Sequence, residues 1–351
     1  MKWIKIIGLS VLALLLVVTL VFFYSINKHV DIGRFQEWYE LQRGGTPPAN
    51  ALTVQFVGVS TMVFSDGETT LMTDGFFTRP SALELIAGEI EPHTDDIKWG
   101  IKRLGITALD ALFVVHSHFD HAMDAPIVAQ LTGAPMYGSS STANIGRGLA
   151  LQEQQIKLFE DRKPIQIGAF KVTPILSKHY EFPNSRVKEQ ALGGNQEIDT
   201  PLIPPVAAMD YKMGGAYTLL FEHPYGSFLL HSSAGWKENG LDDIKADIVI
   251  MGIGGLGAQT ADYQGQYFEE IVDKLAPQKV YLVHWDALVG SIRAPIQAEI
   301  LLLDKLMAKT IAGFEAVERE MKLRPKIPFY LLPQWEKRVL FDGPRSVLGQ
   351  K

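Results

Sequence analysis

The chain begins with the longest apolar run in its sequence. Residues 6–24 read IIGLSVLALLLVVTLVFFY without a charged side chain, and Lys2 and Lys5 precede them. A helix of this length is close to what crosses a hydrocarbon core of about 30 Å. The pattern therefore predicts a transmembrane helix within residues 1–26.

A cleaved signal peptide is the alternative interpretation of this run. The apolar region of a signal peptide is usually only about 7–15 residues long, and cleavage follows a small-x-small pattern. The run here is longer, and the SINKHVD that follows it has no such pattern. We predict an uncleaved signal anchor, with a secreted, cleaved form as the alternative. Lys2 and Lys5 favour a cytoplasmic N-terminus and an extracytoplasmic remainder.

The pattern changes twice after this run. Residues 27–50 are polar and end in GGTPPAN, which interrupts both helices and strands, so we predict a linker there and a folded domain over residues 51–351. The runs predicted to contain strands are 52–64, 69–75, 108–118, 134–139, 163–177, 216–223, 226–233, 247–254 and 279–286. The runs predicted as helices are 81–90, 96–105, 124–133, 141–151, 262–275 and 295–321.

This order of elements bears on the fold class. Strands occur in both halves of the domain with helices between them, which predicts an α/β protein with two helix-flanked sheets rather than one doubly wound sheet. The Ser65-Asp66-Gly67 run predicts a hairpin turn. Residues 181–215 contain four prolines and show no period, so we expect a long loop. Loops of that length in compact domains are usually functional or mobile, and we place substrate specificity there.

Composition narrows the function. With 47% hydrophobic residues and a net charge of −6, the chain has the composition of a folded protein. A pI of about 5.9 and the lack of a Lys/Arg run argue against nucleic acid as a partner. The chain has no Cys, which excludes disulfides, thiolate zinc ligands, iron–sulfur clusters and Cys nucleophiles.

The strongest chemical signal is His116-Ser117-His118-Phe119-Asp120-His121, directly after the apolar run LFVV. Side chains two apart on an extended segment point to the same side, so His116 and His118 can converge on one ion. Asp120 and His121 lie at the turn into the next helix and approach from another direction. Nitrogen and oxygen ligands of this kind favour zinc, with manganese or iron as alternatives. We predict one or two ions here.

This motif resembles that of the metallo-β-lactamase superfamily, and the resemblance extends over most of the chain after Leu52. It implies an αββα four-layer sandwich with the metal site at one edge of the sheets. The resemblance also implies the ligand sets: His116, His118 and His179 for the first metal, and Asp120, His121 and His284 for the second. Asp74, at the end of TTLMTDG, corresponds to an acid that supports the metal loop. The HWD sequence at His284 and the long loop after His179 resemble the branch that contains ascorbate-lactone and N-acylphosphatidylethanolamine hydrolases.

One position departs from the family pattern. The family usually has an aspartate that bridges both metals between its third and last histidines. Here the corresponding stretch is FLLHSSAGW, so Ser232 or Ser233 stands in its place. A hydroxyl is a weak neutral ligand, which predicts a looser second metal, a single metal, or another acid reaching in. His231 is a candidate substitute.

A second motif, Gly252-Ile253-Gly254-Gly255-Leu256-Gly257, has the G-x-G-x-x-G pattern of dinucleotide-binding folds. Such a fold has an acid at the end of the next strand that binds the ribose of the dinucleotide, and this chain has His284 there instead. We expect the glycines to form a tight turn that lets the backbone approach the metal edge. A nucleotide-dependent oxidoreductase is the alternative that this motif keeps open.

Together these features predict a membrane-anchored, metal-dependent hydrolase. A metal-bound hydroxide would attack an ester, lactone, amide or phosphodiester of a small or lipid-like molecule. Asp120 would bind that hydroxide or help to hold the second ion. Asp74 and Asp286 would fix histidine rings by hydrogen bonds. A metal-binding scaffold or sensor with little or no turnover is the main alternative.

Overall fold

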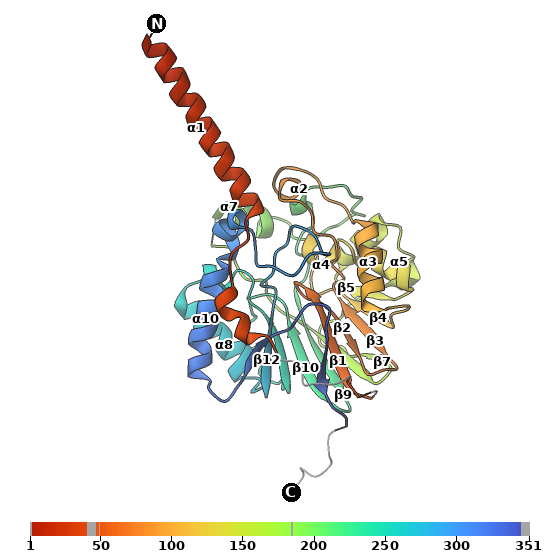
Figure 1. The fold of residues 1–351 in the computed structure, drawn as a ribbon. Helices are drawn as coiled ribbons and strands as arrows, with labels where there is room; N and C mark the ends of the chain where they lie inside the picture. The colour runs from red at the N-terminus through yellow and green to blue at the C-terminus, as the bar shows by residue number, and fades with distance from the viewer. Residues whose placement is uncertain (1, 41–46, 49, 184, 345–351) are drawn as a thin grey trace.

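The computed structural model describes residues 2–40, 47–48, 50–183 and 185–344. Two seven-stranded sheets face each other (Figure 1), as expected. The first sheet has the order β14-β1-β2-β3-β4-β5-β6 and the second β13-β12-β11-β10-β9-β8-β7. The α/β class and the four-layer arrangement are therefore confirmed.

The strands of the first sheet are β1 Leu52–Gly58, β2 Thr61–Ser65, β3 Thr70–Thr73, β4 Ala111–Phe113, β5 Met136–Gly138, β6 Ile156–Leu158 and β14 Lys337–Phe341. Those of the second are β7 Ile165–Ile167, β8 Phe170–Leu176, β9 Tyr217–His223, β10 Gly226–His231, β11 Ile248–Gly252, β12 Lys279–Val283 and β13 Phe329–Leu331. The helices are α1 Lys2–Asn27, α2 Ala82–Ala87, α3 Thr94–Leu104, α4 Phe119–Ala122, α5 Ala125–Thr132, α6 Ser140–Gly148, α7 Ser185–Leu192, α8 Ala261–Phe268, α9 Leu301–Leu303 and α10 Thr310–Leu323.

Three apolar cores hold the layers together. The central core lies between the sheets and contains inward-facing residues of both, such as Phe64 and Phe228, whose ring centroids are 4.6 Å apart. A second core joins the first sheet to α3 and α5, and a third joins the second sheet to α8 and α10. Because each sheet is covered on both faces, its strands read as apolar runs rather than as an alternation.

Local signals in the sequence explain several boundaries. The hairpin between β2 and β3 forms as predicted, with Ser65 opposite Thr70 and the Asp66 carboxylate accepting backbone N–H groups of the turn. A capping box of Ser81 and Glu84 starts α2. Gly105, with a φ of 71°, ends α3 in the left-handed region that favours glycine.

The long helix expected over residues 295–321 is wrong in its first part. Residues 295–300 lie outside any helix, because Ala298 pairs with Asp286 and Ile300 pairs with His29. After α9 and a π turn at Asp304–Ala308, the chain turns at Lys309, with a φ of 49°, before α10 begins. Long-range backbone pairing thus replaces the helix that the local apolar pattern favoured.

The segment 181–215 also differs from the long loop that we expected. It contains α7 and a 3-10 turn at Ala208–Asp210. The side chains of α7 described in the structure are exposed or half-buried, so no apolar stripe marks this helix in the sequence.

The segment predicted as a linker is packed where the structure describes it. Phe35 and Trp38 are buried, and their rings lie 4.7 Å and 5.6 Å from the ring of Phe314 on α10. Tyr39 forms a backbone bridge with Leu331. Residues 28–40 therefore cover part of the outer face of the second sheet. The GGTPPAN stretch lies mostly outside the described residues.

One helix is long and apolar enough to cross a membrane. It covers Trp3–Asn27, with a mean hydropathy of 3.0 over its best window and none of that window buried, and it projects away from the body (Figure 1). A signal sequence has the same properties.

Candidate metal centre

The carboxyl ends of several strands bring the predicted ligands to one edge of the sandwich. His116 and His118 follow β4, and Asp120 and His121 lie in the first turn of α4. His179 follows β8, and His284 follows β12 directly. Since β8, β10, β11 and β12 run in the same direction, their carboxyl ends meet at this edge.

All six predicted ligands lie together, in two groups of three. One group is His116, His118 and His179, and the other is Asp120, His121 and His284. Within each group the ligand atoms lie within 4.8 Å of one another. The groups adjoin, because the ring centroids of His116 and His121 are 3.9 Å apart.

In the second group, both histidine rings lie close to the carboxylate of Asp120. Oδ2 of Asp120 lies 3.3 Å from Nε2 of His121 and 3.3 Å from Nε2 of His284. Nε2 of His116 lies 3.2 Å from Nδ1 of His118 in the first group. Ring nitrogens and a carboxylate oxygen that point at a common position form a donor set that suits a divalent ion.

The protonation states also fit a cation. Burial, together with the neighbouring imidazoles, holds the pKa of His116 and of His179 well below the ordinary value, so both rings are neutral and keep a lone pair. Burial alone would raise the pKa of Asp120, but His121 and His284 hold it well below its usual range. A carboxylate and neutral imidazoles are the forms that bind metals.

Asp74 and Ser60 hold His121 from behind. Oδ2 of Asp74 lies 2.8 Å from Nδ1 of His121 and accepts a hydrogen bond of 2.6 Å from the Ser60 hydroxyl. Its other oxygen accepts the backbone N–H of Val115 at 2.9 Å. Burial lowers the pKa of His121, but the carboxylates of Asp120 and Asp74 outweigh it and raise the pKa to about 10. Without a metal, His121 therefore carries a proton that an ion would displace.

We expect Asp74→Asn to weaken metal binding by about 10- to 100-fold, because a ligand histidine loses the carboxylate that orients its ring. Competition with a chromogenic chelator would measure the change. Asp110→Asn is a suitable control, because the Asp110 carboxylate accepts a backbone N–H near the opposite end of β3. An unchanged affinity in Asp74→Asn would contradict the orienting role.

Asp286 binds backbone. Both of its oxygens accept the N–H of Val59, at 2.8 and 3.0 Å, and Arg79 lies 3.5 Å away. The carbonyl of Val59 in turn accepts the backbone N–H of His284 at 2.9 Å. Asp286 is therefore connected to His284 through the Val59 peptide groups and not through the ring contact that we expected.

His231, the candidate substitute for the missing aspartate, does not join either ligand group. His231 is buried, and burial lowers its pKa to about 4, so the ring is neutral. Its Nδ1 lies 2.7 Å from the Thr218 hydroxyl and its Nε2 lies 2.5 Å from the Gly235 carbonyl. Ser233 accepts the N–H of Tyr180, while Ser232 lies beside His116 at a small cavity. Among the described residues of the two groups, Asp120 is the only carboxylate.

The glycine-rich turn lies against this centre. A Cβ added to Gly254 would meet the carbonyl oxygen of His284 at 2.6 Å and its Nδ1 at 2.7 Å. One added to Gly255, whose φ is 75°, would meet the ring of Tyr180, which stacks on His179. Protein atoms also lie against Gly252 and Gly257. The expected close approach to the metal edge is confirmed, and it leaves these glycines packed on protein.

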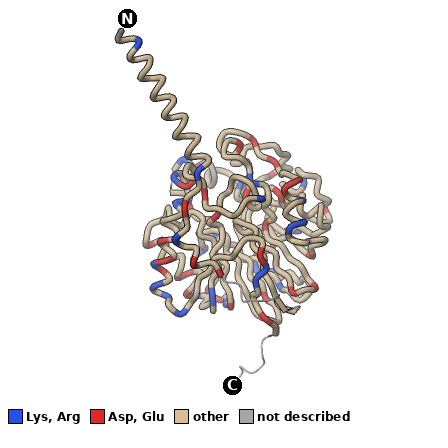
Figure 2. Tube along the Cα trace, in the orientation of Figure 1, with Lys and Arg blue, Asp and Glu red and all other residues tan. Residues whose placement is uncertain are grey.

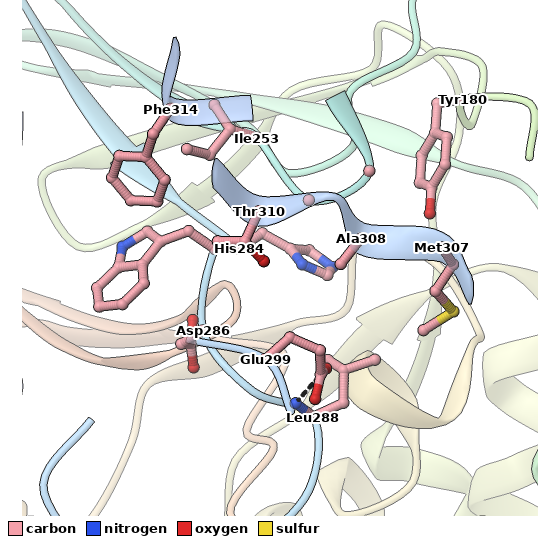
Figure 3. Close-up of a pocket in the computed structure, with 13 residues that line it drawn as sticks. Tyr180, Ile253, His284, Asp286, Leu288, Glu299, Met307, Ala308, Thr310 and Phe314 are labelled. Atoms are coloured by element: carbon pink, nitrogen blue, oxygen red, sulfur yellow. Dashed lines mark hydrogen bonds between the residues drawn. The ribbon is translucent and has the colours of Figure 1, made fainter. Parts of the chain in front are cut away.

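A cavity opens beside His284 (Figure 3), with about 480 Å³ of space between atoms, part of it open to solvent. Its apolar wall includes Ile253, Leu288, Met307 and Phe314. Tyr180 and Trp285, which the sequence placed next to ligands, also line it, whereas Trp236 packs on Tyr263 elsewhere.

Glu299 lies buried in the wall of this cavity. It accepts backbone N–H groups from Leu288 and Ile300, at 3.1 and 2.8 Å. Ser60, Arg79 and Glu299 were not predicted as parts of the site. None lies in a chemical motif. Arg79 reaches the site through Asp286, 207 positions away, and Ser60 reaches it through His121, 61 positions away.

Burial raises the pKa of Glu299 from 4.5 to about 7. The unfolded chain therefore loses this proton at a lower pH than the folded chain, and stability falls as pH rises from about 4.5 to 7. We expect Glu299→Gln to remove that loss, so that between pH 5 and pH 8 the variant gains roughly 2–3 kcal/mol relative to the parent. Urea unfolding of both metal-free chains in detergent would measure it. Parallel pH profiles for the two chains would contradict the expectation.

Comparisons with known proteins show which family and which solved structures the chain resembles. Residues 54–206, which include β4 and the His116–His121 motif, match the family model described as the metallo-beta-lactamase superfamily. No curated protein matches the sequence. The metallo hydrolase Igni18 from the archaeon Ignicoccus hospitalis is 14% identical, with 82% of this chain and 97% of that chain covered and a TM-score of 0.48.

Two further solved structures are similar to the chain. For an isothiocyanate hydrolase from Delia radicum gut bacteria, identity is 15%, coverage is 83% of this chain and 99% of that chain, and the TM-score is 0.47. For CmlA, a diiron beta-hydroxylase from Streptomyces venezuelae, identity is 12%, coverage is 85% of this chain and 55% of that chain, and the TM-score is 0.46. Residues 54–206 are therefore similar to the metallo-β-lactamase superfamily, and the two sheets and two ligand groups have the arrangement that this similarity implies for a metal-dependent hydrolase.

Proposed function

We propose that the chain uses one or two zinc ions to hydrolyse an ester, lactone, amide or phosphodiester in a small or lipid-like molecule. The observation that carries this proposal is the pair of adjoining ligand groups, five imidazoles and one carboxylate, at one edge of the sandwich. Manganese and iron are the alternative ions, since the same ligand types bind them. The branch with ascorbate-lactone and N-acylphosphatidylethanolamine hydrolases remains our proposed placement within the family.

A divalent ion, when bound, supplies Lewis acidity that lowers the pKa of water and polarises the bond to be cleaved. We assign His116, His118 and His179 to one ion and Asp120, His121 and His284 to the other. We assign to Asp120 the role of accepting a hydrogen bond or a proton from the attacking water, which its ionised carboxylate, only 6% exposed, supports. The cavity beside His284 has an apolar wall that can hold the non-reacting part of a substrate.

The N-terminal helix bears on where in the cell the hydrolase domain lies. We propose that residues 1–26 are an uncleaved signal anchor with a cytoplasmic N-terminus, that residues 27–50 connect it to the domain, and that residues 51–351 form an extracytoplasmic hydrolase domain. The length and composition of α1 and the two lysines before its apolar run support this topology.

The second candidate is a metal-binding scaffold or sensor with little turnover. The observation that favours it is the single carboxylate among the described ligands. Two divalent ions would share one negative protein charge, which weakens the hold on the second ion.

One experiment separates these functions. The full chain in detergent is reconstituted with zinc, manganese or iron, and metal content and hydrolysis of chromogenic esters, lactones, amides and phosphodiesters are measured. A His116→Ala/His118→Ala variant should lose both metal and turnover, while His93→Ala, on a partly exposed histidine outside both ligand groups, should retain them. Metal binding without variant-sensitive turnover would favour the scaffold. No bound metal after reconstitution would overturn both functions.

A further inference from the structure

The base of α1 is fastened to the metal-centre edge. Ile26 packs against an apolar cluster of Ala82, Val289, Ile300 and Leu303. One residue after the helix, the Lys28 carbonyl accepts the N–H of Leu301 at 2.8 Å, and His29 pairs with Ile300. Within the described residues, no flexible linker therefore separates the end of α1 from the folded body.

One segment separates this anchor from the cavity. Ile300 and Leu303 contact the base of α1, while Glu299, Met307 and Ala308 from the same segment line the cavity beside His284. The wall of the cavity is thus also the docking site of the helix. A bilayer spanned by α1 would begin close to the cavity.

Exposed apolar side chains gather around the same place. Outside α1, the exposed large apolar residues of the described chain are Leu83, Ile86, Leu131, Leu158, Ile203, Met209, Leu306 and Leu323. The apolar rim, as we call it, comprises five of them: Leu83, Ile86, Ile203, Met209 and Leu306.

Contacts in the structure place the rim next to α1. Ala82 of α2 shares the apolar cluster with Ile26, and Leu306 follows α9, which packs against α1. The segment with Ile203 and Met209 is joined to the end of α2 by the backbone bridge between Ile90 and Val206. Figure 1 shows α2 and the neighbouring loops at the end of the body from which α1 emerges.

The distribution of charged residues favours an apolar rather than an electrostatic contact between this surface and a membrane. Figure 2 shows acidic and basic residues interspersed over the body, without a field of one sign around the base of α1. Charged residues of both signs neighbour the rim in sequence, Glu84 and Glu89 near α2 and Lys305 beside Leu306, so charge of one sign does not mark this surface. Exposed apolar patches on soluble domains mark sites of protein or membrane contact, and here the adjoining helix selects the membrane.

We propose that the apolar rim inserts into the surface of the bilayer that α1 spans, so that the cavity beside His284 opens toward lipid. It follows that amphiphilic substrates reach the metal centre from the membrane, with their apolar part against Leu288, Met307 and Phe314. This delivery of substrate rests on the proposed hydrolase function, whereas insertion of the rim rests only on the proposed membrane anchor.

The lack of native Cys makes a direct test available. Single Cys residues at Leu83, Ile203 and Leu306 on the rim, and at the equally exposed Leu158 and Leu323 elsewhere, are labelled with an environment-sensitive fluorophore. Each full-length chain is reconstituted in nanodiscs of zwitterionic phosphatidylcholine, with and without spin-labelled lipid. We expect spin-labelled lipid to quench the rim positions at least threefold more than the controls, equally at low and high salt.

The outcomes separate this proposal from the hydrolase function. The readout needs neither metal nor turnover, so the His116→Ala/His118→Ala background should give the same quenching. Rim positions quenched no more than Leu158 and Leu323 would overturn insertion, even in an active enzyme. Using three independent rim positions keeps the test valid if one labelled variant fails to fold.

Discussion

Asp120→Asn is expected to lower kcat/KM by about 10³-fold or more, measured on the best substrate of the chromogenic panel, and to reduce the metal content of the chain. The amide keeps the volume of the side chain but removes the only carboxylate among the described ligands. Ligand charge and a positioned proton acceptor are lost together, and each alone is worth about 10²-fold or more in comparable sites. Metal content by plasma mass spectrometry beside steady-state kinetics would measure both effects.

Asp262→Asn is the matched control for this change. Asp262 is exposed in the first turn of α8, so its loss should leave metal content and kcat/KM within about twofold. An Asp120→Asn variant that retained both metal and turnover would exclude Asp120 from the site. One that retained metal but lost turnover would assign Asp120 to proton transfer rather than to metal binding.

Four of the six predicted ligands could be predicted because they lie together in the local sequence. The His116–His121 motif follows an apolar strand, and its spacing alone brings four ligand-type side chains together. His179 and His284 were identified through the resemblance to the family, since nothing in their own surroundings distinguishes them from core histidines. The structure brings all six into two groups.

The resemblance to the family predicted Asp74 behind the ligands, whereas Ser60 and Arg79 could not be predicted, because they act across long sequence separations. Asp286 accepts the N–H of Val59, which is 227 positions away. Ser60 contacts Asp74 and His121, which are 14 and 61 positions away. Such contacts depend on the tertiary fold and leave no period in the sequence. The sequence marked Asp286 as important but gave no sign that it would bind backbone.

The same reason explains the errors around the anchor. Residues 295–300 have an apolar pattern that fits a helix, but they pair with His29 and Asp286 instead. Residues 28–40 look polar and broken, yet Phe35 and Trp38 pack on α10. Both segments obtain their structure from each other and from the second sheet, so neither could be assigned alone.

The glycine turn gives the second large expected effect. Gly254→Ala should lower kcat/KM by about 10²-fold or more and weaken binding of the ion held by Asp120, His121 and His284. The added Cβ would lie 2.6 Å from the backbone oxygen and 2.7 Å from Nδ1 of His284, so the ligand must move. A displacement of about 1 Å at a reacting centre can cost on the order of 10²-fold in rate. Metal titration beside kinetics would show whether both effects occur.

Gly265→Ala provides the comparison that isolates the cause. Gly265 lies within α8 with nothing within 4 Å of an added Cβ, so alanine there should leave activity unchanged and stabilise the helix by about 0.5–1 kcal/mol. If Gly254→Ala instead behaved like Gly265→Ala, the turn would not be fixing His284. A dinucleotide site on the same glycines would give a different result, because Gly254→Ala would then abolish nicotinamide binding and leave the metal in place. Metal content therefore decides between the two interpretations of one motif.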